Sequence, residues 1–142
     1  KPDAKKFFNA GDSKYASGDF AGATAEFDKA IQIDPNYVKA YNNRGMAKDA
    51  IKDEAGAIVD YTKSIELNPK YQFGYYNRGN AEAALKDYTD AVSDYDKAIE
   101  LNPQDTAAYL NRGNTKYRLN DYAGAIADFD KAIELKPRYD KA

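Results

Sequence analysis

A period of 34 residues runs through the chain and constrains its fold more than any other feature of the sequence. Proline, glycine and alanine recur at this interval, together with two aromatic residues. The recurring columns are Pro35, Pro69, Pro103 and Pro137; Gly11, Gly45, Gly79 and Gly113; Ala23, Ala57, Ala91 and Ala125; Phe7, Tyr41, Tyr75 and Tyr109; and Phe27, Tyr61, Tyr95 and Phe129. Such a period predicts units that stack on one another. The four units are 4–37, 38–71, 72–105 and 106–139, with 140–142 as a tail or the start of a truncated fifth unit.

Each unit is predicted to form two helices joined by a short turn. In the fourth unit, Ala125, Phe129 and Ile133 have the spacing of one apolar helix face. An aspartate at positions 19, 53, 87 and 121 stands where the second helix needs an N-cap. The residue before each recurring proline is driven out of the helical region, which ends that helix. The sequence therefore predicts an all-α fold of helix-turn-helix repeats.

The recurring glycines lie inside the first helix of each unit, where glycine costs about 1 kcal/mol relative to alanine. We expect close packing between the two helices of a unit to offset this cost. Gly45 is then expected near Ala57, with the ring of Tyr41 filling the space beside them.

This pattern resembles the tetratricopeptide repeat over residues 4–139. The resemblance implies a right-handed superhelical solenoid whose first helices line a concave groove. It also implies a non-catalytic scaffold that binds a peptide segment or a helix of another protein. The chain departs from the family where an aromatic residue is common, because these positions hold Lys14, Lys48, Glu82 and Lys116.

Composition argues against enzymatic chemistry. The chain has no cysteine and no histidine, so it lacks the thiolate nucleophile, the commonest general base and the commonest metal ligands. Pairs of carboxylates such as Asp94 and Asp96 are two residues apart and do not face each other on a helix. We therefore predict no catalytic residue, no metal and no cofactor.

Charge and hydropathy limit the class of partner. Lysine and arginine number 21 against 23 aspartate and glutamate residues, so there is no basic excess of the kind that nucleic-acid binding needs. No apolar run approaches the roughly 20 residues of a membrane span. We predict a protein or peptide partner, and neither nucleic acid nor a membrane. No signal peptide is visible, which leaves the compartment open and favours a soluble, cytoplasmic protein over a secreted one.

Arginines recur on the first helices and acidic residues on the second helices. The arginines are Arg44, Arg78 and Arg112, and the acidic residues are Glu26, Asp60, Asp94 and Asp128. We expect each arginine to bridge to one of these carboxylates between helices, and contact with a ligand is the alternative. Unit one has Ala10 in place of the arginine.

The candidate binding site is the inner face of the first helices, where helical spacing brings four columns together. The columns are Lys5, Lys39, Phe73 and Ala107; Phe8, Asn42, Tyr76 and Leu110; Asp12, Met46, Asn80 and Asn114; and Tyr15, Asp49, Ala83 and Tyr117. These columns vary while the packing columns repeat, as expected of recognition residues; the alternative is that they are merely exposed. We assign peptide binding to Lys39, Phe73, Phe8, Asn42, Tyr76, Leu110, Asp12, Met46, Asn80, Asn114, Tyr15 and Tyr117.

One inner column is constant, and it consists of Asn9, Asn43, Asn77 and Asn111. A side-chain amide offers a donor and an acceptor that match a peptide backbone. The column resembles the asparagine ladder in the tetratricopeptide arm of the O-linked N-acetylglucosamine transferase, which implies capture of an extended chain. The alternative is that each asparagine bonds the adjacent repeat and fixes its geometry.

The carboxylate clamp, with which some members of this family grip the C-terminal tails of heat-shock chaperones, does not match this chain. Its positions hold Phe8, Asp12, Asn43, Phe73 and Asn77, of which only Asn43 fits. We therefore expect no binding of chaperone tails.

The C-terminal end suggests an alternative function. No solvating helix follows Pro137 in the sequence, so the stacking face of the last helix is expected to be exposed. This predicts weak homo-oligomers through the C-terminal repeat and, as the alternative function, a structural self-assembly module in which uncapped repeats pack end to end. A designed or consensus-like repeat, or an arm cut from a larger protein, is also compatible with the regularity of the units.

Overall fold

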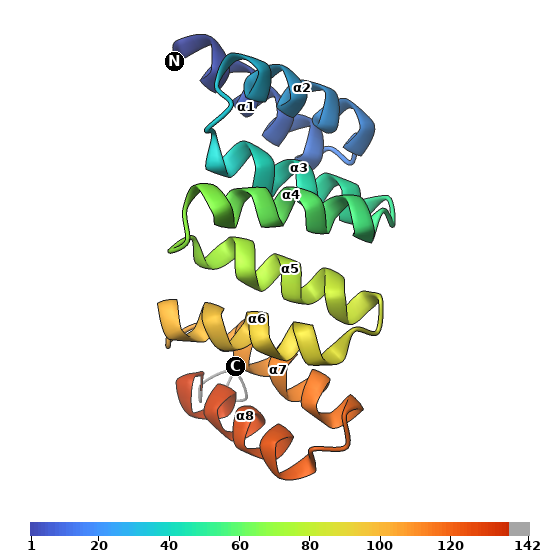
Figure 1. Ribbon diagram of the computed structural model, residues 1–142, viewed down its shortest axis with the longest axis vertical. Helices are drawn as coiled ribbons and strands as arrows, with labels where there is room; N and C mark the ends of the chain where they lie inside the picture. Colours follow the sequence, from blue (N-terminus) through green and yellow to red (C-terminus); the bar gives the residue numbers. More distant parts are fainter. Residues whose placement is uncertain (137–142) are drawn as a thin grey trace.

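The structure is a computed structural model that describes residues 1–136, which form eight helices and no strand. The helices are α1 (Pro2–Ala16), α2 (Phe20–Ile33), α3 (Val38–Ala50), α4 (Glu54–Leu67), α5 (Gln72–Ala84), α6 (Tyr88–Leu101), α7 (Thr106–Arg118) and α8 (Tyr122–Leu135). They stack in chain order along the long axis of the molecule (Figure 1). The predicted all-α solenoid is confirmed, while the end of the fourth unit and the tail 140–142 lie outside the described residues.

The two helices of a unit occupy different sides of the solenoid. Each first helix contacts the first helix of the next unit, so that α1, α3, α5 and α7 form a continuous row. Among residues 1–136, no second helix contacts the second helix of another unit. The closer approach of the first helices places them on the inner side of the curve. No helix in this part of the chain is long and apolar enough to span a bilayer.

Aspartate caps begin three of the four second helices. Asp19, Asp53 and Asp121 accept a hydrogen bond from the backbone N–H of the glycine three residues later, at 2.9, 3.0 and 3.0 Å. A Cβ on any of these glycines would clash with the capping carboxylate, which explains the small residue. In unit three Asp90 replaces the glycine, and Asp87 forms no side-chain cap.

Replacing these caps should therefore have unequal effects. Asp53→Ala should lower the free energy of unfolding by about 1 kcal/mol, because the α4 N-terminus loses its side-chain acceptor. Asp87→Ala should cost less or stabilise, because the Asp87 side chain makes no cap and instead raises the pKa of the neighbouring Asp90 carboxyl. Urea denaturation followed by circular dichroism compares the two. Equal losses would contradict this account.

The recurring glycines leave space for an aromatic ring of the second helix, and not for the first-helix ring that the sequence predicts. A Cβ on Gly45 would lie 2.6 Å from the ring of Tyr61 on α4. The expectation that Tyr41 fills this space is wrong. The Tyr41 hydroxyl instead donates to the Pro35 carbonyl at 2.9 Å, and its ring lies 5.6 Å from the Arg44 guanidinium. The glycine is therefore required by the aromatic residue of the second helix.

The predicted arginine bridges are confirmed. Arg44 binds Asp60 through two hydrogen bonds of 2.9 and 2.7 Å. Arg78 binds Asp94 in the same way at 2.8 and 2.7 Å, and Arg112 binds Asp128 at 2.9 and 2.6 Å. The third guanidinium nitrogen reaches back to the preceding second helix, at Asp28, Thr62 and Asp96 respectively. Each arginine therefore fixes its own hairpin and joins it to the previous unit.

Candidate functional site

The asparagine column of the first helices joins neighbouring units. The Asn43 amide donates to Asp12 Oδ1 at 2.8 Å, and the Asn77 amide donates to Asn42 Oδ1 at 3.0 Å. The Asn111 amide donates to Asn80 Oδ1 at 2.9 Å and to the Tyr76 hydroxyl at 3.0 Å. Every one of these acceptors belongs to the preceding unit, which is the arrangement expected of residues that fix the geometry between repeats.

The same column keeps some hydrogen-bonding capacity for a ligand. Within residues 1–136, the side-chain oxygens of Asn77 and Asn111 accept no hydrogen bond, whereas Asn43 Oδ1 accepts one from Asn42 at 3.1 Å. Asn9 is exposed and forms no side-chain hydrogen bond in this part of the chain. Asn111 thus uses both amide N–H groups within the protein, whereas Asn43 and Asn77 each donate once within residues 1–136. The groove therefore offers the side-chain oxygens of Asn77 and Asn111 together with one N–H each of Asn43 and Asn77.

A pocket of about 370 Å³ lies in the middle of the inner face, and we call it the aromatic pocket. Its wall carries three aromatic side chains from the start of α5, and the ring centroids of Tyr71 and Phe73 are 5.6 Å apart. Asp105, the N-cap residue of α7, lies at the edge of the pocket. The lining residues are Asn42, Asn43, Met46, Tyr71, Phe73, Tyr76, Asn77, Asp105 and Ala107. This pocket therefore combines apolar surface with a carboxylate and amides.

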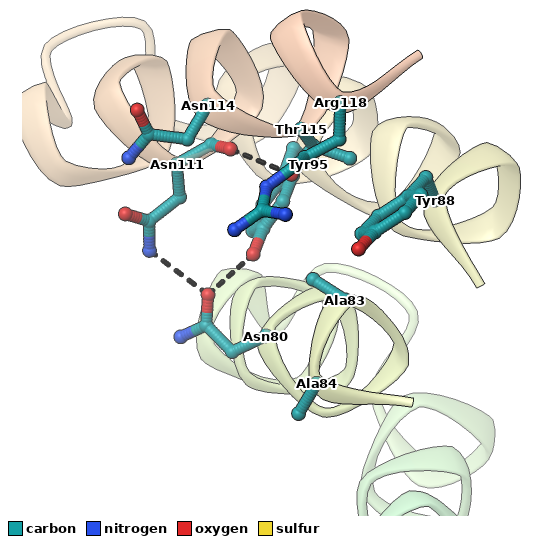
Figure 2. Close-up of a pocket in the computed structure, with 9 residues that line it drawn as sticks. All are labelled: Asn80, Ala83, Ala84, Tyr88, Tyr95, Asn111, Asn114, Thr115 and Arg118. Carbon is teal, nitrogen blue, oxygen red and sulfur yellow. Dashed lines mark hydrogen bonds between the residues drawn. The ribbon is translucent and has the colours of Figure 1, made fainter. Parts of the chain in front are cut away.

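A second pocket, of about 320 Å³, lies between units three and four and is lined by residues of α5, α6 and α7. Asn80, Ala83 and Ala84 line it from α5. Figure 2 shows Asn80 and Ala83 on the side of α5 that faces α7, with the Arg118 guanidinium directed into the space between these helices. Arg118 forms no ion pair or side-chain hydrogen bond within residues 1–136. The remaining lining residues are Tyr88, Tyr95, Asn111, Asn114 and Thr115. This end of the groove therefore presents an available cation.

Two further pockets extend the inner face. One, of about 260 Å³, is lined by Tyr15, Met46, Asp49, Ala50, Tyr61 and Asn77. Burial raises the pKa of its Asp49 carboxyl, which accepts a hydrogen bond from the Tyr61 hydroxyl at 2.7 Å. The other pocket, of about 410 Å³, includes Leu110 and Thr106. The pockets thus follow the row of first helices from unit one to unit four.

Several of the sequence-predicted site residues are engaged in packing. Asn42 is only 3 % exposed, and it bonds Asn43 and Asn77. Phe8 stacks on Tyr37 with a centroid distance of 4.9 Å. Tyr117 is exposed but packs edge-on against Tyr122 at 5.2 Å and lines none of these pockets. Lys39 is exposed and lines none of them either.

Among the lining residues that sequence reasoning missed are Tyr71, Asp105 and Arg118. Tyr71 and Asp105 precede the first helices, and the predicted columns were drawn from residues within those helices only. Their own column changes from Tyr37 and Tyr71 to Asp105, so the criterion of variation between units would have found it. Arg118 is likewise the one charged residue in a column that is otherwise alanine.

Family models match most of the chain. One model described as tetratricopeptide repeat matches residues 73–105 and 106–139. Another model with the same description matches residues 38–71. A third, described as TPR repeat, matches residues 11–48. The matched segments follow the 34-residue units closely. A comparison with curated protein sequences finds no significant match.

Solved structures of similar fold cover nearly the whole chain. A crystal structure of MamA is 28 % identical with a TM-score of 0.85, covering 92 % of this chain and 77 % of its own. The first TPR of Spaghetti (RPAP3), solved with the HSP90 peptide SRMEEVD, is 26 % identical with a TM-score of 0.82, covering 84 % of this chain and 94 % of its own. A MamA RS-1 variant with a TM-score of 0.88 and 24 % identity covers 100 % of this chain and 80 % of its own, and it shows the fold alone.

Proposed function

Because this chain belongs to the tetratricopeptide repeat family, we propose that it is a non-catalytic interaction scaffold that binds an extended segment of a partner protein in its inner groove. The observation that carries this proposal is the series of pockets along α1, α3, α5 and α7. Successive pockets on one continuous face suit a chain that runs across the repeats, with side chains entering the pockets and backbone N–H groups reaching the free asparagine oxygens.

The similar structure solved with a peptide supports binding of this kind, but the peptide itself is a poor model for this groove. SRMEEVD is acidic at its C-terminal end. The clamp positions here hold Phe8, Asp12, Phe73 and Asn77, and none of these residues is a cation. We therefore propose a partner that differs from an acidic chaperone tail.

Blocking the groove tests the proposal. Ala107 is exposed and lines the aromatic pocket, whereas Ala55 is an exposed alanine on α4, outside the pockets described above. Peptides are first selected from a displayed library for binding to the unmodified protein. They should bind the Ala107→Trp variant at least about 10-fold more weakly than the unmodified protein, because the tryptophan fills the pocket and a loss of about 1.4 kcal/mol of binding free energy is a tenfold change in affinity. Fluorescence anisotropy measures the affinities.

The Ala55→Trp variant is the matched control, and its affinities should equal those of the unmodified protein. Selected peptides that bind both tryptophan variants equally well, or a library that yields no binder, would contradict groove binding.

The exposed face of α8 favours a second function, self-association. Ile126 and Ile133 are 60 % and 62 % exposed, and Tyr122 is exposed beside them. In unit two the equivalent Ile58 and Ile65 are partly covered by α5.

We propose that two copies pair through α8. On the first helices, the positions that contact the second helix of the preceding unit are the buried residues Ala40, Gly74 and Ala108. The equivalent position on α1 is the exposed Lys6. Head-to-tail stacking of α8 on α1 would therefore bury a lysine, unlike pairing through α8.

Sedimentation velocity over a range of protein concentrations tests this pairing. The unmodified protein should show a concentration-dependent dimer, and the Ile126→Glu/Ile133→Lys variant should remain monomeric, because charges on the face cannot be desolvated without partners. A monomer at the highest concentration reached would exclude the pairing.

A further inference from the structure

The aromatic pocket has the chemistry of a cation site. We propose that it receives an arginine or lysine side chain of the bound segment, with the charged group at Asp105 and the hydrocarbon stem along Phe73. This inference rests on the proposed groove function and specifies one property of the partner, a basic residue opposite α5 and α7.

The charge of the pocket is negative. Asp105 is the lining residue with a formal charge, and no lysine or arginine is among the lining residues. Its Oδ1 accepts a long hydrogen bond of 3.4 Å from the Ala108 N–H, which leaves the other carboxylate oxygen for a ligand. A second carboxylate, Asp12, lies close enough to Tyr71 that it adds to the effect of burial in raising the pKa of that tyrosine. An entering cation would therefore meet the Asp105 carboxylate, and Asp12 outside the lining adds to the negative potential.

The aromatic side chains give the pocket its apolar surface. Phe73 is 51 % exposed although it is an apolar residue, and its ring meets that of Tyr71 edge-on at an interplanar angle of 69°. Two rings at this angle offer a cation and its methylene stem both a face and an edge. Cation–aromatic contacts contribute about 0.5–2 kcal/mol each, depending on desolvation. Long basic side chains place their stems on such surfaces and their charge at the polar rim.

The neutral polar groups of the pocket include a free acceptor for a cationic donor. The Asn77 side-chain oxygen accepts no hydrogen bond within residues 1–136, and the Asn77 amide donates once, to Asn42. Asn43 donates once, to Asp12, and the Tyr76 oxygen already accepts from Asn111 at 3.0 Å. A guanidinium or ammonium group, which only donates, finds acceptors in the Asn77 oxygen and the Asp105 carboxylate.

The equivalent positions one unit earlier lack these features. There the position of Phe73 is held by Lys39, and the position of Asp105 is held by Tyr71. The cation site thus arises from substitutions that are particular to units three and four. The presence of Lys39 in the column also shows that the fold accepts a lysine at this place.

Small peptides test the site without knowledge of the natural partner. The probe is acetyl-Gly-Arg-Gly-amide, and its control is the same peptide with citrulline, a neutral isostere of arginine. In a ¹H–¹⁵N titration, the arginine peptide should shift the backbone amides of Tyr71, Phe73 and Asp105. The citrulline peptide should bind at least about 10-fold more weakly, because a charge-assisted contact is worth more than about 1.4 kcal/mol.

Two variants assign the interaction to the pocket. Asp105→Asn removes the charge but keeps a good N-cap for α7, and it should weaken the arginine peptide about 10-fold. Phe73→Lys should abolish binding by repulsion while the fold persists, as judged by circular dichroism. Val59→Ala, at an exposed position of α4 away from the pocket, should leave binding unchanged.

The outcomes separate this inference from the groove function. It is overturned if arginine and citrulline peptides bind equally, if neither shifts these amides, or if Asp105→Asn binds as well as the unmodified protein. If library-selected peptides lose affinity on Ala107→Trp yet contain no basic residue, the groove function stands and the cation site alone fails. If no library peptide binds while the arginine probe does, the groove function alone fails.

Discussion

The Arg78→Ala variant should lower the free energy of unfolding by about 3–5 kcal/mol, the cost of leaving a buried carboxylate without its partner. Asp94 is 6 % exposed and receives two hydrogen bonds from Arg78. The Glu82 carboxyl also faces Asp94, and a carboxyl cannot replace the lost cation. Urea denaturation monitored by circular dichroism measures the loss, with the hairpin of α5 and α6 expected to unfold first.

Equivalent changes in other units should cost less. Lys48 lies 3.0 Å from Asp60 and Lys116 lies 3.6 Å from Asp128, so each of these aspartates keeps a cation when its arginine is removed. Arg44→Ala should therefore cost about half as much as Arg78→Ala, within the range for partly compensated ion pairs of about 1–3 kcal/mol. An Arg78→Met/Asp94→Leu double variant should recover most of the stability. Equal losses for Arg44→Ala and Arg78→Ala would refute the role assigned to the lysines.

Glu82→Lys should stabilise the protein by about 2 kcal/mol at pH 7, since a buried unsatisfied polar group costs about 1–3 kcal/mol. The other three units place a lysine here, facing an acid on the second helix, as in the 2.7 Å pair of Lys14 and Glu26. In unit three Glu82 faces Asp94, and its Oε1 is buried without a partner among the described residues. The substitution would restore the ion pair that the other units have.

The same glutamate should make stability depend on pH. Burial, followed by the contact with Asp94, raises the pKa of Glu82 to about 9 from an ordinary value of 4.5. Between these two values the folded protein holds a proton that the unfolded chain has released. Stability from this group therefore falls as the pH rises from about 5 to 9. Urea denaturation at pH 5, 7 and 9 should show this slope in the unmodified protein and a flatter curve in Glu82→Lys.

A control must separate this local effect from the change in net charge. Glu66→Lys changes the charge by the same amount at an exposed position on α4 that forms no ion pair within residues 1–136. It should change stability by less than about 0.5 kcal/mol. If Glu66→Lys reproduces the gain or the flatter pH curve, then long-range charge and not the Glu82 site is responsible.

Local signals in the sequence were enough to predict the fold. Prolines and aspartate caps mark the helix ends one unit after another, and the 34-residue period repeats them four times. Because a solenoid unit contacts only its neighbours, no contact between distant parts of the chain had to be guessed. The arginine bridges were predictable for the same reason, since Arg44 and Asp60 lie 16 residues apart within one hairpin.

The candidate site was predicted less completely. Helical spacing placed Met46, Phe73, Tyr76 and Asn77 on one inner face, and all of them line the aromatic pocket. It did not identify Tyr71 and Asp105, which enter the pocket from turns whose geometry a helical pattern does not describe. It also placed Asn42 among the exposed residues, although the amide network with Asn43 and Asn77 buries it.

The sequence by itself thus determined the repeat, the helices and the pairing of charges within each hairpin, because these depend on residues close together in the chain. Only the tertiary structure decided which side chains face one another in the packed molecule. Between units, the asparagine amides turn toward the preceding repeat; within a unit, Tyr61 and not Tyr41 occupies the space at Gly45, and Glu82 meets Asp94. These outcomes depend on how the helices are rotated against one another, which is set by packing across each whole interface and not by any single motif.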